Sequence, residues 1–227
     1  MPNASVDPQQ ALRRLVDGNH RFVNEVTSMR ARVSASREWR ARLAEGQTPF
    51  ATIVSCSDSR VPAEIVFDQG LGDLFIVRNA GNAIGPVSLA SIEFAVAKLG
   101  TRLVVVLAHE SCGAFRAACD VAEGAAAPSE SLRELLDRLL PALAAAGPEG
   151  SREERCELAA QIYARQVAEM IARSPLVEPL LRSGALSVVP AYYRLTEGTV
   201  AFAGPVPPPS AKKAPCSEEA ELAHEAA

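Results

Sequence analysis

The chain has 227 residues, of which 48% are apolar, and its 23 basic and 27 acidic side chains give a formal net charge of −4. This length and composition allow one main domain with a substantial core. Because charges of both signs are interspersed, we expect no nucleic-acid partner and no binding to an anionic membrane. The strongest apolar run, residues 103–108, is too short to span a bilayer, and the first residues lack a signal-peptide core, so the sequence predicts a cytoplasmic protein.

The first half of the chain alternates between predicted helices and strands. The spacing of apolar residues predicts an amphipathic helix over residues 8–25 and a second helix over residues 37–45. A further helix is expected over residues 88–98. Three apolar, β-branched runs predict buried strands, each leading into a polar loop: residues 50–56, 73–79 and 101–110. With no tight hairpin between them, these elements predict right-handed βαβ units in a parallel sheet.

The second half of the chain is predicted to be mostly helical. Residues 113–182 show helical patterns that are interrupted by breaks containing glycine and proline, at residues 123–128 and 147–150. Residues 185–195 and 199–204 then predict two strands joined by a short turn. This pair would form an antiparallel edge of the sheet.

These elements together define the predicted fold class and domain organisation. The fold class is α/β, with a mostly parallel central sheet flanked by helices and an antiparallel edge strand. Residues 1–204 are predicted to form a single domain, with the N-terminal helix as an arm. Residues 205–227 are rich in proline and then polar, so they are predicted to be a disordered tail.

Two short segments carry groups that bind metals. Cys56 ends one predicted strand, and His109 and Cys112 follow at the end of another. Because ligands bind at the carboxyl ends of the strands of open α/β sheets, we expect these loops to meet. Two thiolates and one imidazole suit zinc, and three protein ligands leave the fourth tetrahedral position open, as in catalytic sites. A lone strand-end cysteine or a lone His-x-x-Cys is weak evidence, but their combination favours a zinc site.

The other cysteines and the terminal histidine are given no role in this chemistry. An odd number of widely spread cysteines, 5 in all, argues against a disulfide framework. Cys119 and Cys156 fall on predicted helices and are interpreted as small buried residues. Cys216 and His224 lie in the predicted tail and are not expected to be ligands.

Asp58 and Arg60 follow the first candidate ligand at intervals of two residues. Residues two apart in an extended or turning loop can face the same way, so we expect an ion pair that keeps the carboxylate ionised and oriented. The alternative is a surface pair that contributes little. Its place directly after Cys56 favours a catalytic role.

The motif Cys-x-Asp-x-Arg, followed about fifty residues later by His-x-x-Cys, resembles the hallmark of the β-class carbonic anhydrases. The similarity extends through residues 55–82, 91–100 and 106–114, and residues 188–204 resemble the family's closing strands. The resemblance implies a carbonate dehydratase, a lyase with one Zn²⁺ per subunit, in which zinc-bound hydroxide hydrates carbon dioxide reversibly to bicarbonate and a proton. It also implies a homodimer or a dimer of dimers, with zinc near the dimer interface.

The resemblance assigns roles to individual residues. The three candidate ligands match the family's metal ligands, and Asp58 and Arg60 match its catalytic dyad. Gln47 matches a glutamine that some members use to hydrogen-bond the substrate. The remaining matches are residues that line the substrate pocket or lie beside it, in part from the partner subunit: Phe75, Phe94, Val61, Ala80 and Gly113.

Two further expectations and two alternatives complete the interpretation. Ile53 stands where bicarbonate-inhibited members carry tryptophan, so we expect that regulatory site to be absent. With Gln47 and Arg60 present, we expect the metal site to stay open near neutral pH, rather than closed by Asp58.

One alternative function is a hydrolase of carbon disulfide or carbonyl sulfide on the same scaffold. The other is a zinc-stabilised binding module without catalysis, which the intact Asp58 and Arg60 disfavour.

Overall fold

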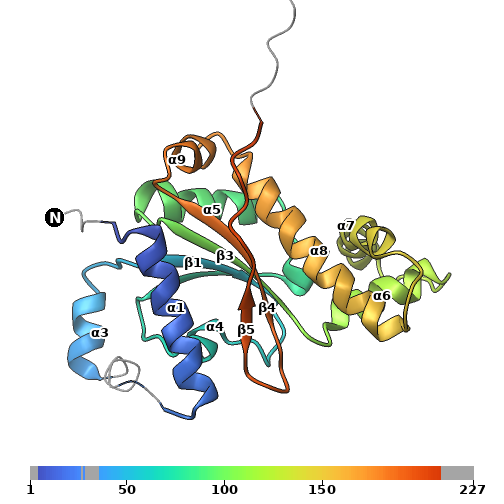
Figure 1. Ribbon diagram of the computed structural model, residues 1–227, viewed down its shortest axis with the longest axis horizontal. Helices are drawn as coiled ribbons and strands as arrows, with labels where there is room; N and C mark the ends of the chain where they lie inside the picture. Colours follow the sequence, from blue (N-terminus) through green and yellow to red (C-terminus); the bar gives the residue numbers. More distant parts are fainter. Residues whose placement is uncertain (1–4, 27, 29–35, 211–227) are drawn as a thin grey trace, which may run out of the picture.

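A five-stranded sheet forms the centre of the molecule, with helices on both faces (Figure 1). The computed structural model describes residues 5–26, 28 and 36–210. The strand order is β2-β1-β3-β4-β5, in which the first four strands are parallel and β5 runs antiparallel to β4. This architecture confirms the predicted α/β class, including the antiparallel edge strand.

The strands coincide with the apolar runs of the sequence. Their bounds are β1 Ala51–Ser55, β2 Leu74–Arg78, β3 Leu103–His109, β4 Ser187–Tyr193 and β5 Val200–Phe202. β1 and β3 are buried along their whole length, because they lie inside the sheet and are covered on both faces. β2 lies at one edge and is half-buried over most of its length.

The three helices whose bounds the sequence predicts begin and end within two residues of those bounds. The helix bounds are α1 Pro8–Val23, α3 Arg37–Leu43, α4 Ala63–Val66, α5 Pro86–Lys98, α6 Gly113–Ala122, α7 Glu130–Ala146, α8 Arg152–Ala172 and α9 Glu178–Arg182, with a 3-10 turn, η1, at Ala80–Asn82. Both predicted breaks in the helical half separate helices, α6 from α7 and α7 from α8. Asp7 and Ser151 act as N-caps, each with its side chain accepting from backbone N–H groups of the first turn.

Two cores cover the two faces of the sheet, and β3 contributes to both. Val104 and Val106 point into the core beneath α5, α6, α7 and α8. Val105 and Leu107 point into the opposite core, beneath α1 and α4. Successive side chains of a strand alternate between faces, so a strand covered on both sides is apolar at every position. This is why residues 103–108 give the strongest apolar run.

The C-terminal segment stays in contact with the sheet for a few residues beyond β5. Val206 is buried, and its backbone N–H donates to the carbonyl of Val188 at 2.9 Å. Most of the predicted tail, with Cys216 and His224, lies outside the described residues, so the division at residue 204 stays a prediction. Within the part of the chain that the structure describes, no helix is both long and apolar enough to cross a membrane.

Candidate metal centre

Three candidate ligands meet at the carboxyl edge of the sheet. Cys56 follows β1, His109 is the last residue of β3, and Cys112 is the N-cap of α6. β1 and β3 are parallel neighbours, so their ends lie together, and the ligand atoms of the three residues are within 4.8 Å of one another. All three residues are buried. Over residues 5–26, 28 and 36–210, no second group of three such side chains has this spacing.

The imidazole of His109 presents an unpaired nitrogen to this cluster. Its Nδ1 lies 2.8 Å from the carbonyl oxygen of Glu110. A carbonyl can only accept, so Nδ1 carries the proton and Nε2 is left with a free lone pair. Nε2 is buried and has no hydrogen-bond partner in the structure. Leaving such an acceptor unsatisfied is costly, whereas a metal ion would satisfy it.

The two thiols of the cluster interact strongly. Cys56 Sγ lies 3.9 Å from Cys112 Sγ, and it accepts from the backbone N–H groups of Asp58 at 3.4 Å and Gly81 at 3.3 Å. The hydrogen bond from Cys112, with further donors, lowers the pKa of Cys56 to about 4. The same bond, together with burial, raises the pKa of Cys112. A cation in place of the shared proton would favour both thiolates.

Asp58 and Arg60 form a bidentate pair beside the cluster. Arg60 donates from Nε to Asp58 Oδ1 at 2.9 Å and from Nη2 to Oδ2 at 2.8 Å, and its backbone N–H donates to Oδ1 at 2.9 Å. These bonds hold the pKa of the Asp58 carboxyl well below its usual range. Asp58 Oδ2 lies 3.9 Å from His109 Nε2. The carboxylate therefore sits at the rim of the cluster in its ionised form.

The turn between His109 and Cys112 is fixed on both sides. Ser111 has φ of 55°, a left-handed conformation that is uncommon for a residue other than glycine. Its carbonyl accepts from Arg60 Nη2 at 3.2 Å. On the other side, the carboxylate of Glu110 accepts from the backbone N–H of Thr196 at 3.1 Å, which ties the turn to the β4–β5 connection.

Sequence reasoning missed a second group of supporting residues, at the last position of β2 and in the turn η1 that follows it. Arg78 donates from Nε to the carbonyl of Cys56 at 2.9 Å and from Nη2 to that of Asp58 at 2.6 Å. The Asn82 amide donates to the carbonyl of Leu107 at 2.6 Å. The signal in the sequence was an arginine at the end of a predicted strand, directly before a turn. The hydrogen-bond partners of Arg78 could be identified only from the pairing of β2 with β1, which places Arg78 opposite Ser55.

Gly81 brings its backbone N–H close to Cys56 because it has no side chain. Its φ is 60°, and a Cβ at this position would lie 3.0 Å from both Ala114 Cβ and Leu139 Cδ1. Both the backbone conformation and the close packing therefore favour glycine. Any larger residue would push η1 away from the Cys56 sulfur.

The predicted pocket residues are more scattered. Phe75 of β2 and Phe94 of α5 contact each other, with ring centroids 6.4 Å apart, and Phe94 is 50% exposed. Val61 is buried in the core beneath α1 and α4. Ala80 and Gly113 are exposed, at the start of η1 and of α6.

Gln47 has no recorded contact with the metal cluster in the described residues. It is exposed in the segment that precedes β1. Among the hydrogen bonds of the described residues, none joins its side chain to the cluster. Its substrate-binding role therefore stays a prediction.

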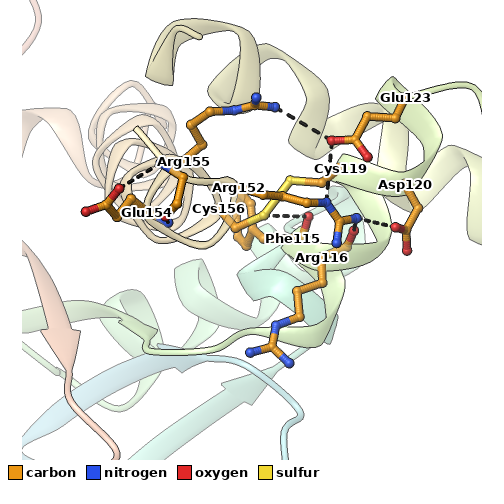
Figure 2. The surroundings of a disulfide bond; sticks show 10 residues. Phe115, Arg116, Cys119, Asp120, Glu123, Arg152, Glu154, Arg155 and Cys156 are labelled. Carbon is orange, nitrogen blue, oxygen red and sulfur yellow. Dashed lines mark hydrogen bonds and ion pairs between the residues drawn. A yellow bond between two sulfur atoms is a disulfide. The ribbon is translucent and has the colours of Figure 1, made fainter. Parts of the chain in front are cut away.

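Cys119 and Cys156 differ from expectation. They lie on helices α6 and α8 and are buried, as predicted, but the structure joins them in a disulfide, so their interpretation as separate small core residues is wrong (Figure 2). The physical reason is tertiary: α6 and α8 pack against each other, which brings together residues 37 positions apart. Helical periodicity alone contains no information about which helices are neighbours.

The fold and the cluster define an α/β protein with a three-ligand candidate metal centre beside an ionised carboxylate. A family model described as "Carbonic anhydrase" matches residues 51–200. Carbonic anhydrase 2 of Mycobacterium tuberculosis is 40% identical over 200 residues, which cover 87% of this chain and 93% of that protein. The chain therefore belongs to the carbonic anhydrase family, in its β class.

Solved structures agree with this assignment. The β-carbonic anhydrase CafA of Aspergillus fumigatus is 28% identical, with a TM-score of 0.66 over 73% of this chain and 80% of that one. A β-carbonic anhydrase of Sordaria macrospora, described as tetrameric, is 22% identical and shares the fold, with a TM-score of 0.68 over 85% of this chain and 96% of that one.

Proposed function

We propose that this chain is a zinc-dependent carbonic anhydrase that interconverts carbon dioxide with bicarbonate and a proton. One observation carries the proposal: the buried Cys56, His109 and Cys112 present their ligand atoms to one point, next to the carboxylate of Asp58. Arg60 holds that carboxylate. The matched family region, residues 51–200, contains the complete cluster and the dyad.

The donor set fits a single Zn²⁺ per chain. Two thiolates and one imidazole are ligands that zinc prefers, and the buried, unpaired Nε2 of His109 supplies the nitrogen in the required tautomer. When bound, zinc would lower the pKa of a coordinated water from about 16 to about 7, which supplies a nucleophile at neutral pH. Three protein ligands leave room for that water.

Asp58 acts as a hydrogen-bond acceptor that orients the nucleophile. Arg60 keeps its pKa low, so the carboxylate is ionised at neutral pH and cannot donate a proton. Oδ1 is occupied by two donors from Arg60, whereas Oδ2 accepts one and is the oxygen near His109 Nε2. Oδ2 is therefore the oxygen placed to accept a hydrogen bond from the reacting water or hydroxide. This hydrogen bond would turn a lone pair of the reacting oxygen toward the substrate carbon.

Two features support an open site without bicarbonate regulation. Both carboxylate oxygens of Asp58 are engaged by Arg60, which favours a position beside the metal rather than on it. Ile53, where the regulated members carry tryptophan, is fully buried in the core beneath α1 and α4. A structure at pH 8 with Asp58 on the metal would contradict the open site, and bicarbonate soaking that displaced Gln47 would contradict the lack of regulation.

We infer that β2 and α5 contribute to a homodimer, or a dimer of dimers. β2 is an edge strand, and Val87 and Phe94 of α5 are 82% and 50% exposed. An unpaired edge beside apolar side chains is a surface that proteins normally cover. Carbon dioxide would then approach along Phe75 and Phe94, and Gln47 would hydrogen-bond it. Light scattering of the purified chain measures the oligomeric state, and a monomer would refute this inference.

The activity is tested by stopped-flow hydration of carbon dioxide on protein of measured zinc content. Asp58→Ala should keep its zinc and lose most of its kcat, whereas Cys56→Ser should lose zinc as well. Ser59→Ala is the matched control, because Ser59 lies between Asp58 and Arg60 with an exposed side chain. Parent activity no faster than buffer would refute the proposal. Turnover of carbonyl sulfide or carbon disulfide in place of carbon dioxide would favour the alternative hydrolase. Bound zinc without turnover of any of these substrates would favour a binding module.

A further inference from the structure

A covalent link joins the helix that starts at the metal centre to the long helix that covers the sheet. Cys119 of α6 and Cys156 of α8 form a disulfide, and only 0% and 6% of their surfaces are exposed (Figure 2). The other two cysteines of the described residues, Cys56 and Cys112, are free and belong to the cluster. The four sulfurs therefore form two chemically different pairs.

Helix α6 connects these two pairs. Cys112 is its N-cap, and the first helical hydrogen bond runs from the N–H of Arg116 to the carbonyl of Cys112 at 3.2 Å. Cys119 follows two turns later, about 10 Å along the helix axis and within about 20° of the same face. Two hydrogen-bonded turns move as one unit, so a displacement of α6 at Cys119 also displaces Cys112.

Helix α8 is the fixed side of the link. It packs on β3 and β4, within the core that contains Val104 and Val188. β3 ends at His109, so α8 rests on the strand that positions this ligand. The disulfide consequently restrains Cys112 relative to His109.

Polar contacts along the same seam are exposed and weaker. Arg152 of α8 donates to the carbonyl of Arg116 at 3.3 Å and pairs with Asp120, and its Nε lies 3.4 Å from Glu123 (Figure 2). The Asp120 and Glu123 side chains are 57% and 51% exposed. Ion pairs of this kind restrain two helices only loosely. The disulfide is the stronger restraint between α6 and α8.

A small cavity lies between the metal-centre turn and the disulfide. Its volume is about 20 Å³, enough for one water, and it is lined by Ser111, Cys112, Arg116, Arg152 and Cys156, with two glutamates. Cys156 borders this cavity, whereas Cys119 is fully buried. Cys156 is therefore the more accessible of the two bridged cysteines, and it is the one that a reductant would attack when this side of the seam opens.

We propose that the Cys119–Cys156 disulfide is a reducible brace that sets how tightly Cys112 holds the metal, an inference that rests on the proposed function. A thiolate of a dithiol reductant attacks Cys156 Sγ, and Cys119 leaves as a thiolate that takes up a proton. The second thiolate of the reductant then displaces Cys156 from the mixed disulfide. The protein gains two electrons and two protons, and the reductant becomes a disulfide. Once the disulfide is reduced, α6 can shift against α8. Cys112 then holds the metal less tightly, so the metal would be released more easily.

The test compares the zinc-loaded full chain in its two redox states. One sample is reduced with dithiothreitol, both are passed through gel filtration without air, and a chromophoric zinc chelator then reports the rate of zinc release. Non-reducing peptide mapping measures the Cys119–Cys156 crosslink in each sample. We expect the reduced protein to release zinc roughly 10-fold faster, the lower end of the range for residues that support metal ligands.

Two variants serve as controls for this comparison. Cys119→Ser should release zinc at the reduced rate under both treatments, whereas Cys216→Ser, altered outside the described residues, should respond like the parent. Equal release rates for the two states of the parent would overturn the coupling. Absence of the Cys119–Cys156 crosslink from the untreated sample would refute the proposed disulfide itself. A chain that binds no zinc in either state would overturn the proposed function and the coupling together, while the peptide map still decides whether the bridge exists.

Discussion

Replacing Arg78 by alanine tests whether the metal centre is supported from the neighbouring strand. The side chain donates to the carbonyls of Cys56 and Asp58 at 2.9 and 2.6 Å. A hydrogen bond from a charged donor contributes about 1.5–3 kcal/mol when well buried. Because Arg78 is only partly buried, we discount the pair of bonds and expect the free energy of unfolding to fall by about 2 kcal/mol in total.

The same change should also affect catalysis, which a control arginine should not. Zinc-loaded Arg78→Ala should lose roughly 10- to 100-fold in kcat, the range for residues that support metal ligands. Arg102 donates to the carbonyls of Val96 and Thr101 at 3.1 and 3.4 Å, at the opposite end of β3. Arg102→Ala should therefore lose similar stability in urea but keep its kcat in stopped-flow hydration. Equal kcat values for the two variants would refute the supporting role.

Three further predictions concern the carboxylate, the metal and the core. Because the pKa of Asp58 is lowered in the fold, its stabilisation is present above the unfolded pKa of about 3.9 and is lost as pH falls through the folded pKa. The stability difference between the parent and Asp58→Asn should therefore shrink between about pH 5 and pH 2, and a constant difference in acid unfolding curves would contradict this. Zinc at about 100 times its Kd should stabilise the apo-protein by about 2.7 kcal/mol, so an unchanged Tm would argue against the metal site. Leu139 is 0% exposed, so Leu139→Ala should lower the free energy of unfolding in urea by about 2–5 kcal/mol. Leu158 is 46% exposed, so Leu158→Ala should lower it by less than about 1 kcal/mol. Equal losses in the two variants would contradict the burial of Leu139.

Local patterns were enough to predict most of the elements. Residues 103–108 are apolar at every position because β3 is covered on both faces, so the sequence alone predicts this strand. α5 begins at Pro86, two residues before the predicted start, because proline is well suited to the first turn of a helix. The short helix α4 was missed, since its four residues are too few to show periodicity.

The parts that could not be predicted depend on which elements are neighbours. The partners of Arg78 follow from its register opposite Ser55 across β1 and β2, which no local pattern specifies. The Cys119–Cys156 bond depends likewise on the packing of α6 against α8. The three metal ligands were accessible because each lies at the end of a recognisable element, and parallel sheets bring such ends to one edge. The sequence therefore predicts where a residue lies within its helix or strand, but it does not predict which helices and strands contact each other.

The dependence of the metal centre on the pairing of β1 with β3 has a kinetic consequence. Cys56 and Cys112 are 56 residues apart, and they meet only when these two strands lie side by side. Parallel pairing closes a long loop before any contact compensates its entropy, so it is slow compared with helix formation. A refolding chain thus has no complete ligand set until its sheet exists. Metal capture follows assembly of the sheet, and zinc in the refolding buffer should raise the yield of native protein without accelerating the first appearance of β-structure.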